Sequence, residues 1–236
     1  MKTLKTIAII ALLSIVPSFG IVFPSTFTST LGPIGAPDEF QINSFSFTNF
    51  NHATNELTMN IDFNFGGGFS SGAFQAFTVP GFATASGDVP LNVGDILFHN
   101  GGLMYAVAMS AHNGLTQGSL YKVNGTLNAQ TVLGNPGGGY RPLHAVWADA
   151  TGVSAVGSGT VTAASISGNH FDTTVVVNTN AAFRTLLNGN FDFSFASATC
   201  GNDVVYGSVS ATPEPGTFLM LGGGLIGLAL IRRKVA

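Results

Sequence analysis

Apolar and polar side chains alternate strictly between residues 57 and 65. A strand places successive side chains on opposite faces, so this period of two predicts a β-strand with one buried and one wet face. Residues 191–195 repeat the pattern with three phenylalanines. The first pattern consists of apolar Leu57, Met59, Ile61, Phe63 and Phe65, with polar Thr58, Asn60, Asp62 and Asn64 between them. The chain is therefore predicted to build a sheet with a phenylalanine-rich buried face.

Short apolar segments separated by Gly-, Asn- and Pro-rich breaks extend the strand prediction along the chain. The further strand candidates are residues 40–50, 95–99, 103–109, 119–123, 153–156, 173–178 and 204–210. One helix is predicted, at 180–188, with Asn180 as its cap and Gly189 as its stop. Many short strands favour an all-β fold, a single two-sheet β-sandwich of jelly-roll-like form over residues 39–211. A β-barrel is the alternative fold.

The first twenty residues have the three parts of a secretory signal peptide. Lys2 and Lys5 precede an apolar run at 7–16, and small residues follow at Ser18 and Gly20. This order predicts export and cleavage after Gly20. An irregular lead-in at 21–38 is expected next, because prolines with Ser, Thr and Gly interrupt any regular pattern there.

The segment 212–236 also has three parts. Its tripeptide is Pro213, Glu214 and Pro215, its apolar segment is 217–231, and its basic tail at 232–236 contains Arg232, Arg233 and Lys234. A helix of the fourteen residues 218–231 would be about 21 Å long, which is short against a hydrocarbon core of about 30 Å. Basic residues beside an apolar segment stay on the cytoplasmic side, so the precursor is predicted to be a hairpin with its middle outside the inner membrane.

The segment 213–234 resembles the PEP-CTERM sorting signal of Gram-negative bacteria, which is read by a membrane cysteine protease called exosortase. The resemblance rests on the order of tripeptide, Gly- and Leu-rich segment and basic cluster. It implies recognition near residues 213–215, removal of the tail, and release or attachment at the cell surface, often in strains that make extracellular polysaccharide. Its implied partners are exosortase and the Sec translocon, with transient attachment to the inner membrane. Residues 199–204 are similar to a segment near the last strands of some PEP-CTERM proteins.

Other processing signals fit the tail less well. A GPI signal normally lacks a terminal basic cluster. A Gram-positive sortase signal needs an LPxTG-like motif, which residues 213–217 do not supply. A plain single-pass anchor is the remaining alternative.

Charge excludes one class of partner. Between residues 21 and 212 there are three basic and ten acidic residues, a net charge of −7. Nucleic-acid binding requires clustered Lys and Arg, so we expect no nucleic-acid partner. Cys200 is the only cysteine, which excludes an internal disulfide; we expect a buried thiol, with an intermolecular disulfide as the alternative.

Catalytic motifs are weak. Gly68, Ser70 and Gly72 fit the G-x-S-x-G elbow of serine hydrolases, which needs a strand before it and a helix after it, but the chain reaches Pro80 soon afterwards. We interpret the motif as a turn. The histidines form neither of the common zinc-binding patterns, an HExxH motif or an i,i+4 pair. They are His52, His99, His112, His144 and His170.

One segment concentrates residues suited to a ligand: Tyr140, Arg141, His144, Trp147 and Asp149. Aromatic faces beside polar groups are what sugar binding requires. The alternative, which we favour, places Trp147 in the core and Tyr140 and Arg141 in a loop.

Calcium is the one cofactor that the sequence suggests. Asn60, Asp62 and Asn64 present oxygens that calcium prefers, although the same residues mark the wet face of a strand. We expect no cofactor and no metal.

We therefore expect an exported, exosortase-sorted protein of the cell surface or extracellular matrix, without catalytic activity. Its expected role is a structural or adhesive component of the exopolysaccharide or biofilm layer. A secreted carbohydrate-binding module is the first alternative, and a secreted hydrolase is the second.

Overall fold

A computed structural model describes residues 23, 26–34, 37–51, 54–79, 83–84, 87–134, 140–210 and 222–224. The chain divides into two units, a body over Phe23–Ser210 and a second unit formed by Met1–Val22 and Ala211–Ala236. Of the second unit only the helical residues 222–224, within the predicted apolar segment, are described, so the predicted signal peptide and the rest of the sorting segment lie outside the described residues. No described helix is both long enough and apolar enough to cross a membrane.

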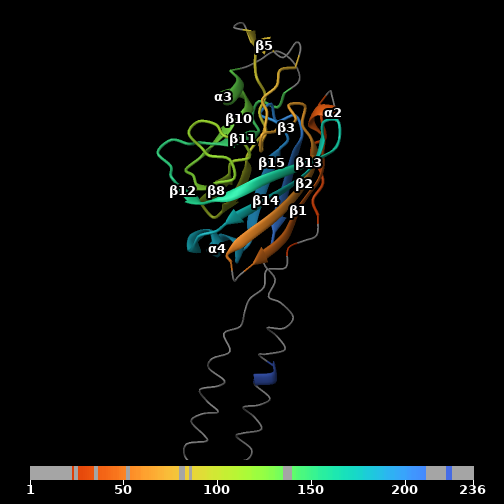
Figure 1. Ribbon diagram of the computed structural model, residues 1–236. Helices are drawn as coiled ribbons and strands as arrows, with labels where there is room; N and C mark the ends of the chain where they lie inside the picture. Colours follow the sequence, from red (N-terminus) through yellow and green to blue (C-terminus); the bar gives the residue numbers. More distant parts are fainter. Residues whose placement is uncertain are drawn as a thin grey trace, which may run out of the picture. The chain divides into compact units, whose positions relative to one another are not determined.

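Two antiparallel sheets form the body (Figure 1). The four-stranded sheet has the order β1 (Ile42–Asn51), β2 (Glu56–Asn64), β14 (His170–Asn178) and β13 (Gly159–Ser167). The six-stranded sheet has the order β12 (Ala155–Gly157), β9 (Leu120–Lys122), β8 (Leu103–Val107), β7 (Ile96–Asn100), β15 (Phe191–Ala196) and β16 (Val204–Val209). Most neighbours are consecutive along the chain, so hairpins and a three-stranded meander build the sheets, a simpler connectivity than that of a jelly roll.

Short elements complete the body. The helices are α2 (Pro37–Phe40), α3 (Ala129–Leu133) and α4 (Ala181–Leu187). The short strands are β3 (Phe69–Ser70), β4 (Ala73–Phe74), β5 (Ala83–Thr84), β6 (Gly87–Asp88), β10 (Thr126–Asn128) and β11 (Ala145–Ala148). The predicted helix is present as α4. Asn180 caps its N-terminus as predicted, since Phe183 N donates to Asn180 Oδ1 at 2.8 Å.

Phenylalanine rings join the two sheets. Phe45 of β1 stacks on Phe193 of β15 with centroids 4.7 Å apart, and Phe63 of β2 meets Phe195 edge-on at 5.3 Å. All four rings are essentially inaccessible to solvent. Burying one such side chain stabilises a fold by roughly 1.5–3 kcal/mol, so this layer is the principal core. The body is thus an all-β two-sheet sandwich, which confirms the predicted fold class.

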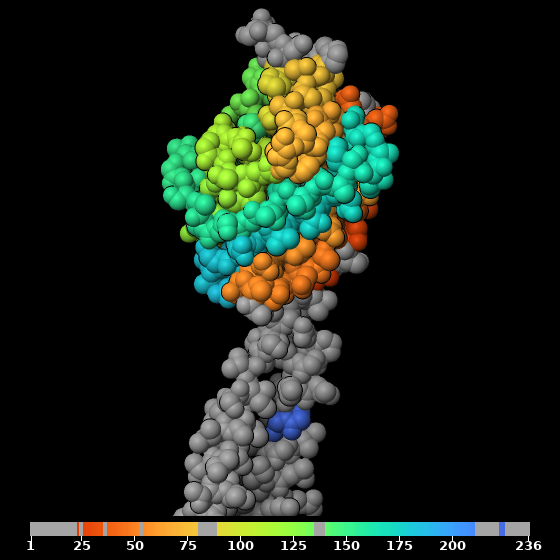
Figure 2. Space-filling model, in the orientation of Figure 1, coloured from red at the N-terminus to blue at the C-terminus, as the bar shows by residue number. Residues whose placement is uncertain are grey.

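The outer faces of the sheets differ. That of the four-stranded sheet is polar and open, and Figure 2 shows β13 and β14 (teal to cyan) beside β1 and β2 (orange) on the visible surface. Part of the other sheet's outer face is covered by a second apolar cluster. Its buried members are Leu97, Ala106, Ala108, Leu115, Tyr121, Val123 and Ala148. Strands β15 and β16 leave exposed polar side chains beside this cover, namely Asp192, Tyr206 and Ser208.

Residues 26–34 of the predicted lead-in are held against the body by the segment before β16. The Asp203 carboxylate accepts hydrogen bonds from Ser29 Oγ and from Ile42 N, the latter at 2.7 Å. Asn202 bonds the backbone of Ile34 twice, accepting from its N at 2.5 Å and donating to its O at 2.6 Å. We name Asn202 and Asp203, together with Arg141, the clamp.

Arg141 completes the clamp with main-chain contacts alone. Its guanidinium donates to the carbonyl oxygens of Leu31 at 3.0 Å and Gly32 at 2.9 Å, and also to those of Gly201 and Asn202. The Arg141 guanidinium is therefore occupied by hydrogen bonds to backbone carbonyl oxygens. This gives the 199–204 segment a structural role, because it ties the start of the body to its last hairpin.

Candidate functional site

The structure does not gather the five residues that the sequence grouped into one site, although His144 N donates to Arg141 O at 3.3 Å. Trp147 lies in β11 and is buried, with its indole N–H donating to Val93 O at 3.2 Å. Its ring stacks on that of His112 with centroids 4.1 Å apart. The ring face is already occupied, so Trp147 belongs to the core, as the favoured alternative expected.

Asp149 and Tyr140 have different surroundings. Asp149 is solvent-facing, and hydrogen bonds from the side chain and backbone of Thr151 lower its pKa. Tyr140 is half-buried and packs near the small cluster of Ala129, Val146, Ala196 and Val204. Arg141 serves the clamp. Of the five, only His144 meets an exposed aromatic residue, and that residue is Tyr206.

Tyr206 borders a depression on the outer face of the six-stranded sheet. We name it the Tyr206 groove, and its volume is about 470 Å³. Its lining residues are His99, Asp192, Phe193, Tyr206, Gly207 and Ser208. Three strands supply them, since β7, β15 and β16 are neighbours in the sheet.

Strand register explains how these residues meet. Asp192 lies opposite His99 of β7 on one side and opposite Ser208 of β16 on the other. Ser208 Oγ donates to Asp192 Oδ1, and His99 Nδ1 lies 3.9 Å from Asp192 Oδ2. The side chains of His99 and Asp192 are 56% and 52% exposed, so both can contact a ligand from solution.

The aromatic end of the groove is neutral. Tyr206 is 40% exposed, and its hydroxyl lies 2.5 Å from His144 Nδ1. Burial raises the pKa of Tyr206, although Arg141 acts in the opposite direction. Burial and then the charge of Arg141 lower the pKa of His144. Both groups are therefore uncharged at neutral pH, and the hydroxyl donates to the imidazole nitrogen.

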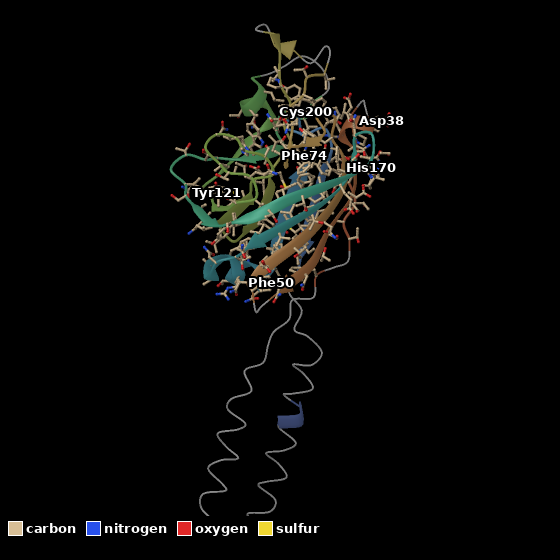
Figure 3. The ribbon with its side chains drawn as sticks, in the orientation of Figure 1. Asp38, Phe50, Phe74, Tyr121, His170 and Cys200 are labelled. Carbon is tan, nitrogen blue, oxygen red and sulfur yellow. The ribbon has the colours of Figure 1, made fainter. Side chains whose placement is uncertain are left out.

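A second depression of about 470 Å³ lies at the end of the four-stranded sheet. Its lining residues are Asp38, Asn43, Asn64, Ser167, Gly168, Asn169 and His170. Figure 3 shows Asp38 and His170 at the same edge of the body. None of these lining residues is Phe, Tyr or Trp, the side chains with the large apolar faces on which a sugar ring stacks.

Of the residues considered for calcium, Asn60 and Asp62 each use one side-chain oxygen within the sheet, whereas the buried Oδ1 of Asn64 has no hydrogen-bond partner among the described residues. Asn60 Oδ1 accepts from Thr174 Oγ1 at 3.1 Å. One oxygen of Asp62 meets both His170 Nε2 and Asn43 Nδ2, the latter at 2.9 Å. Within the described residues no three His, Cys, Asp or Glu side chains form a group able to hold a metal ion. His52 lies outside the described residues.

Ser70 lies in a tight hairpin rather than before a helix. Strand β3 pairs directly with β4, and the turn between them has Ser71 at φ 52° and Gly72 at φ 79°. A hydrolase elbow needs a helix after the nucleophile, so this arrangement is the turn that we favoured from the sequence.

Comparison with known proteins identifies the tail. Residues 211–234 match the family described as the PEP-CTERM protein-sorting motif. The chain carries a PEP-CTERM sorting signal. No curated protein and no solved structure matches the chain. The PEP-CTERM signal implies exosortase as the processing partner, and a membrane-anchored precursor that is exported to the cell surface.

Proposed function

We propose that this PEP-CTERM protein is a non-catalytic structural or adhesive component of the extracellular polysaccharide or matrix layer. The observation that carries the proposal is the sorting signal at 211–234, which directly follows a compact sandwich ending in β16. Residues 1–20 would direct export through the Sec translocon. Exosortase would then recognise Pro213–Pro215 and remove the apolar tail, which leaves the sandwich outside the cell.

The described residues support a body without catalysis. Ser70 lies in a hairpin, and the one cysteine is buried with its pKa raised to about 12 by burial. A depressed pKa activates a thiol as a nucleophile, and burial shifts the pKa of this thiol in the opposite direction. Broad ester, glycoside and peptide assays are expected to give no turnover. Activity that depends on Ser70 or on a chelatable metal would favour the secreted hydrolase instead.

Intact-mass analysis in the native host tests the sorting part of the proposal. The protein released by the wild-type host is expected to begin near residue 21 and to end near residues 213–215. In a strain without exosortase the tail should remain. A tail retained to Ala236 in both strains would show a plain anchor and would overturn the proposal.

Variants separate recognition of the motif from general damage. Replacing Pro213 and Pro215 together by Ala is expected to leave the tail in place in the wild-type host. Pro90→Ala, at an exposed position of the body, is the matched control and should be processed normally. Equal processing of both variants would remove the tripeptide from the mechanism.

A further inference from the structure

We infer that the Tyr206 groove is a saccharide-binding site that takes a segment of a neutral polysaccharide. This inference rests on the proposed function, because it names the ligand and the surface through which an exported body would adhere. Three features carry it: a fixed exposed aromatic ring, polar groups beside that ring, and the distribution of charge.

The ring of Tyr206 has the presentation that stacking requires. Tyr206 points away from the phenylalanine core because Val205 and Val209 of the same strand are buried while Tyr206 is 40% exposed. The hydrogen bond to His144 fixes the hydroxyl, and the main-chain N–H of Tyr206 donates to Thr30 Oγ1 at 3.1 Å. A sugar's apolar C–H face can pack on such a ring without first ordering it, which lowers the cost of binding.

Polar groups at the other end of the groove match the hydroxyls of a sugar. The Asp192 carboxylate accepts hydrogen bonds, the Ser208 hydroxyl can donate and accept, and the His99 ring offers a further nitrogen. Asp192 receives one hydrogen bond from Ser208 and keeps acceptor capacity for a ligand. Because neighbouring strands are about 4.8 Å apart, the three strands spread these groups over about 10 Å of surface.

Charge selects a neutral ligand over an acidic one. The region between residues 21 and 212 carries a net charge of −7, and Asp192 lies in the groove itself. Arg141, whose charge acts on Tyr206, directs its guanidinium to backbone carbonyls of the clamp. A polyuronate would therefore meet like charge without a paired guanidinium, which disfavours it.

An open groove with one exposed tyrosine ring for stacking binds weakly per site. Adhesion to a polymer gains from repeated sites, because linked binding events become effectively intramolecular. The test therefore uses the full-length chain, solubilised in mild detergent, on immobilised dextran, mannan and neutral β-glucan, with alginate as the acidic polymer. Bound protein is measured against free protein for each polymer.

Four variants decide the role of the groove. Tyr206→Ala is expected to lower affinity for the bound neutral polymer roughly tenfold, since it removes the stacking surface. Tyr206→Phe should retain most of the binding, and Asp192→Asn should weaken it. Asp172→Asn, an exposed carboxylate on β14, is the matched control and should bind like the wild type. Unfolding midpoints confirm that each variant is folded.

Several results would overturn the inference. The wild-type protein could bind none of the neutral polymers, or could bind alginate as tightly as it binds them. The Tyr206→Ala variant could bind like the wild type. The Asp172→Asn variant could lose as much binding as the Asp192→Asn variant. Processing in the host is measured separately. Lost binding with normal processing contradicts only the groove, whereas a retained tail with intact binding contradicts only the sorting proposal.

Discussion

The carboxylate of Asp95 lies 3.2 Å from Nε2 of His112, and both side chains are almost fully buried. Asp95 also accepts hydrogen bonds from Ala148 N at 2.9 Å and from Met109 N at 3.3 Å. One carboxylate thus joins β7, β8 and β11 at their ends. Because a buried charge without a partner is costly, the pair is expected to govern stability.

The surroundings of His112 favour its protonated form. His112 Nδ1 lies 2.9 Å from Ser110 O, which can only accept, so Nδ1 carries a hydrogen. Without a second proton, the lone pair of Nε2 would face the carboxylate directly. Burial raises the pKa of Asp95. For His112, burial acts to lower the pKa, but the contacts with Asp95 and Ser110 together outweigh it and raise it.

Stability is predicted to fall as the pH rises. Unfolded histidine titrates near pH 6.5, so the stabilisation from the proton on His112 is complete below that pH and is lost as the pH passes the higher folded value. The raised pKa of Asp95 has the same sign, and its contribution begins to be lost as the pH rises above the unfolded carboxyl value of 3.8. Each unit of pKa shift corresponds to about 1.4 kcal/mol. Urea unfolding between about pH 6 and pH 9, followed by Trp147 fluorescence, measures the change.

Asp95→Asn is the matched control for this prediction. It keeps the shape of the side chain but removes the charge that raises the pKa of His112. The decline of stability with pH should be shallower in the variant than in the wild type. A wild-type protein whose stability rises over this range, or parallel pH curves for the two proteins, would show that the pair does not hold the proton.

The thiol of Cys200 is predicted to be unreactive in the folded protein. Its side chain is buried, and burial raises its pKa to about 12, so almost no thiolate exists near neutral pH. Iodoacetamide at about pH 8 should add no mass to the native chain and one carbamidomethyl group after unfolding in urea. Rapid labelling of the native protein, or a disulfide-linked dimer in its non-reduced form, would contradict the buried thiol.

Gly207→Ala is predicted to destabilise the sandwich by about 1–3 kcal/mol through overpacking. A Cβ at this position would lie 2.6 Å from the ring of Phe27 and closer still to that of Phe193. Those rings meet edge-on at 4.7 Å, so neither can move freely. Gly125→Ala is the control, because a Cβ there meets nothing within 4 Å. Equal urea midpoints for the two variants would show that the rings yield without cost.

Local pattern was enough to predict the core strands. Strand β2 was predicted at 57–65 and spans Glu56–Asn64, because every second residue is a large apolar one. Strand β13 was missed, since the sequence GTVTAASIS has small side chains and shows only one buried residue, Val161. Its position is set by pairing with β14, which no local pattern reports.

The Tyr206 groove depends on contacts that are distant in sequence. His99, Asp192 and Tyr206 come together only because β15 pairs with β7 on one side and with β16 on the other. Alternation within 191–195 does place Asp192 opposite the phenylalanines, which is the one local signal for an exposed carboxylate. For Trp147 the sequence alone was ambiguous. It identifies an aromatic residue but cannot distinguish a ring buried in the core, as Trp147 is, from a ring on a binding surface.

Asp203→Ala is predicted to loosen the start of the body. The carboxylate is fully buried, and its removal leaves the N–H of buried Ile42 without its acceptor and frees Ser29. An unsatisfied buried donor costs about 1–3 kcal/mol, which should appear in urea unfolding. Limited proteolysis should also cut sooner near Phe27, whose ring packs on Phe193. Asp172→Ala, an exposed carboxylate on β14, should change neither measurement, and equal effects of the two substitutions would show that the clamp does not hold the lead-in.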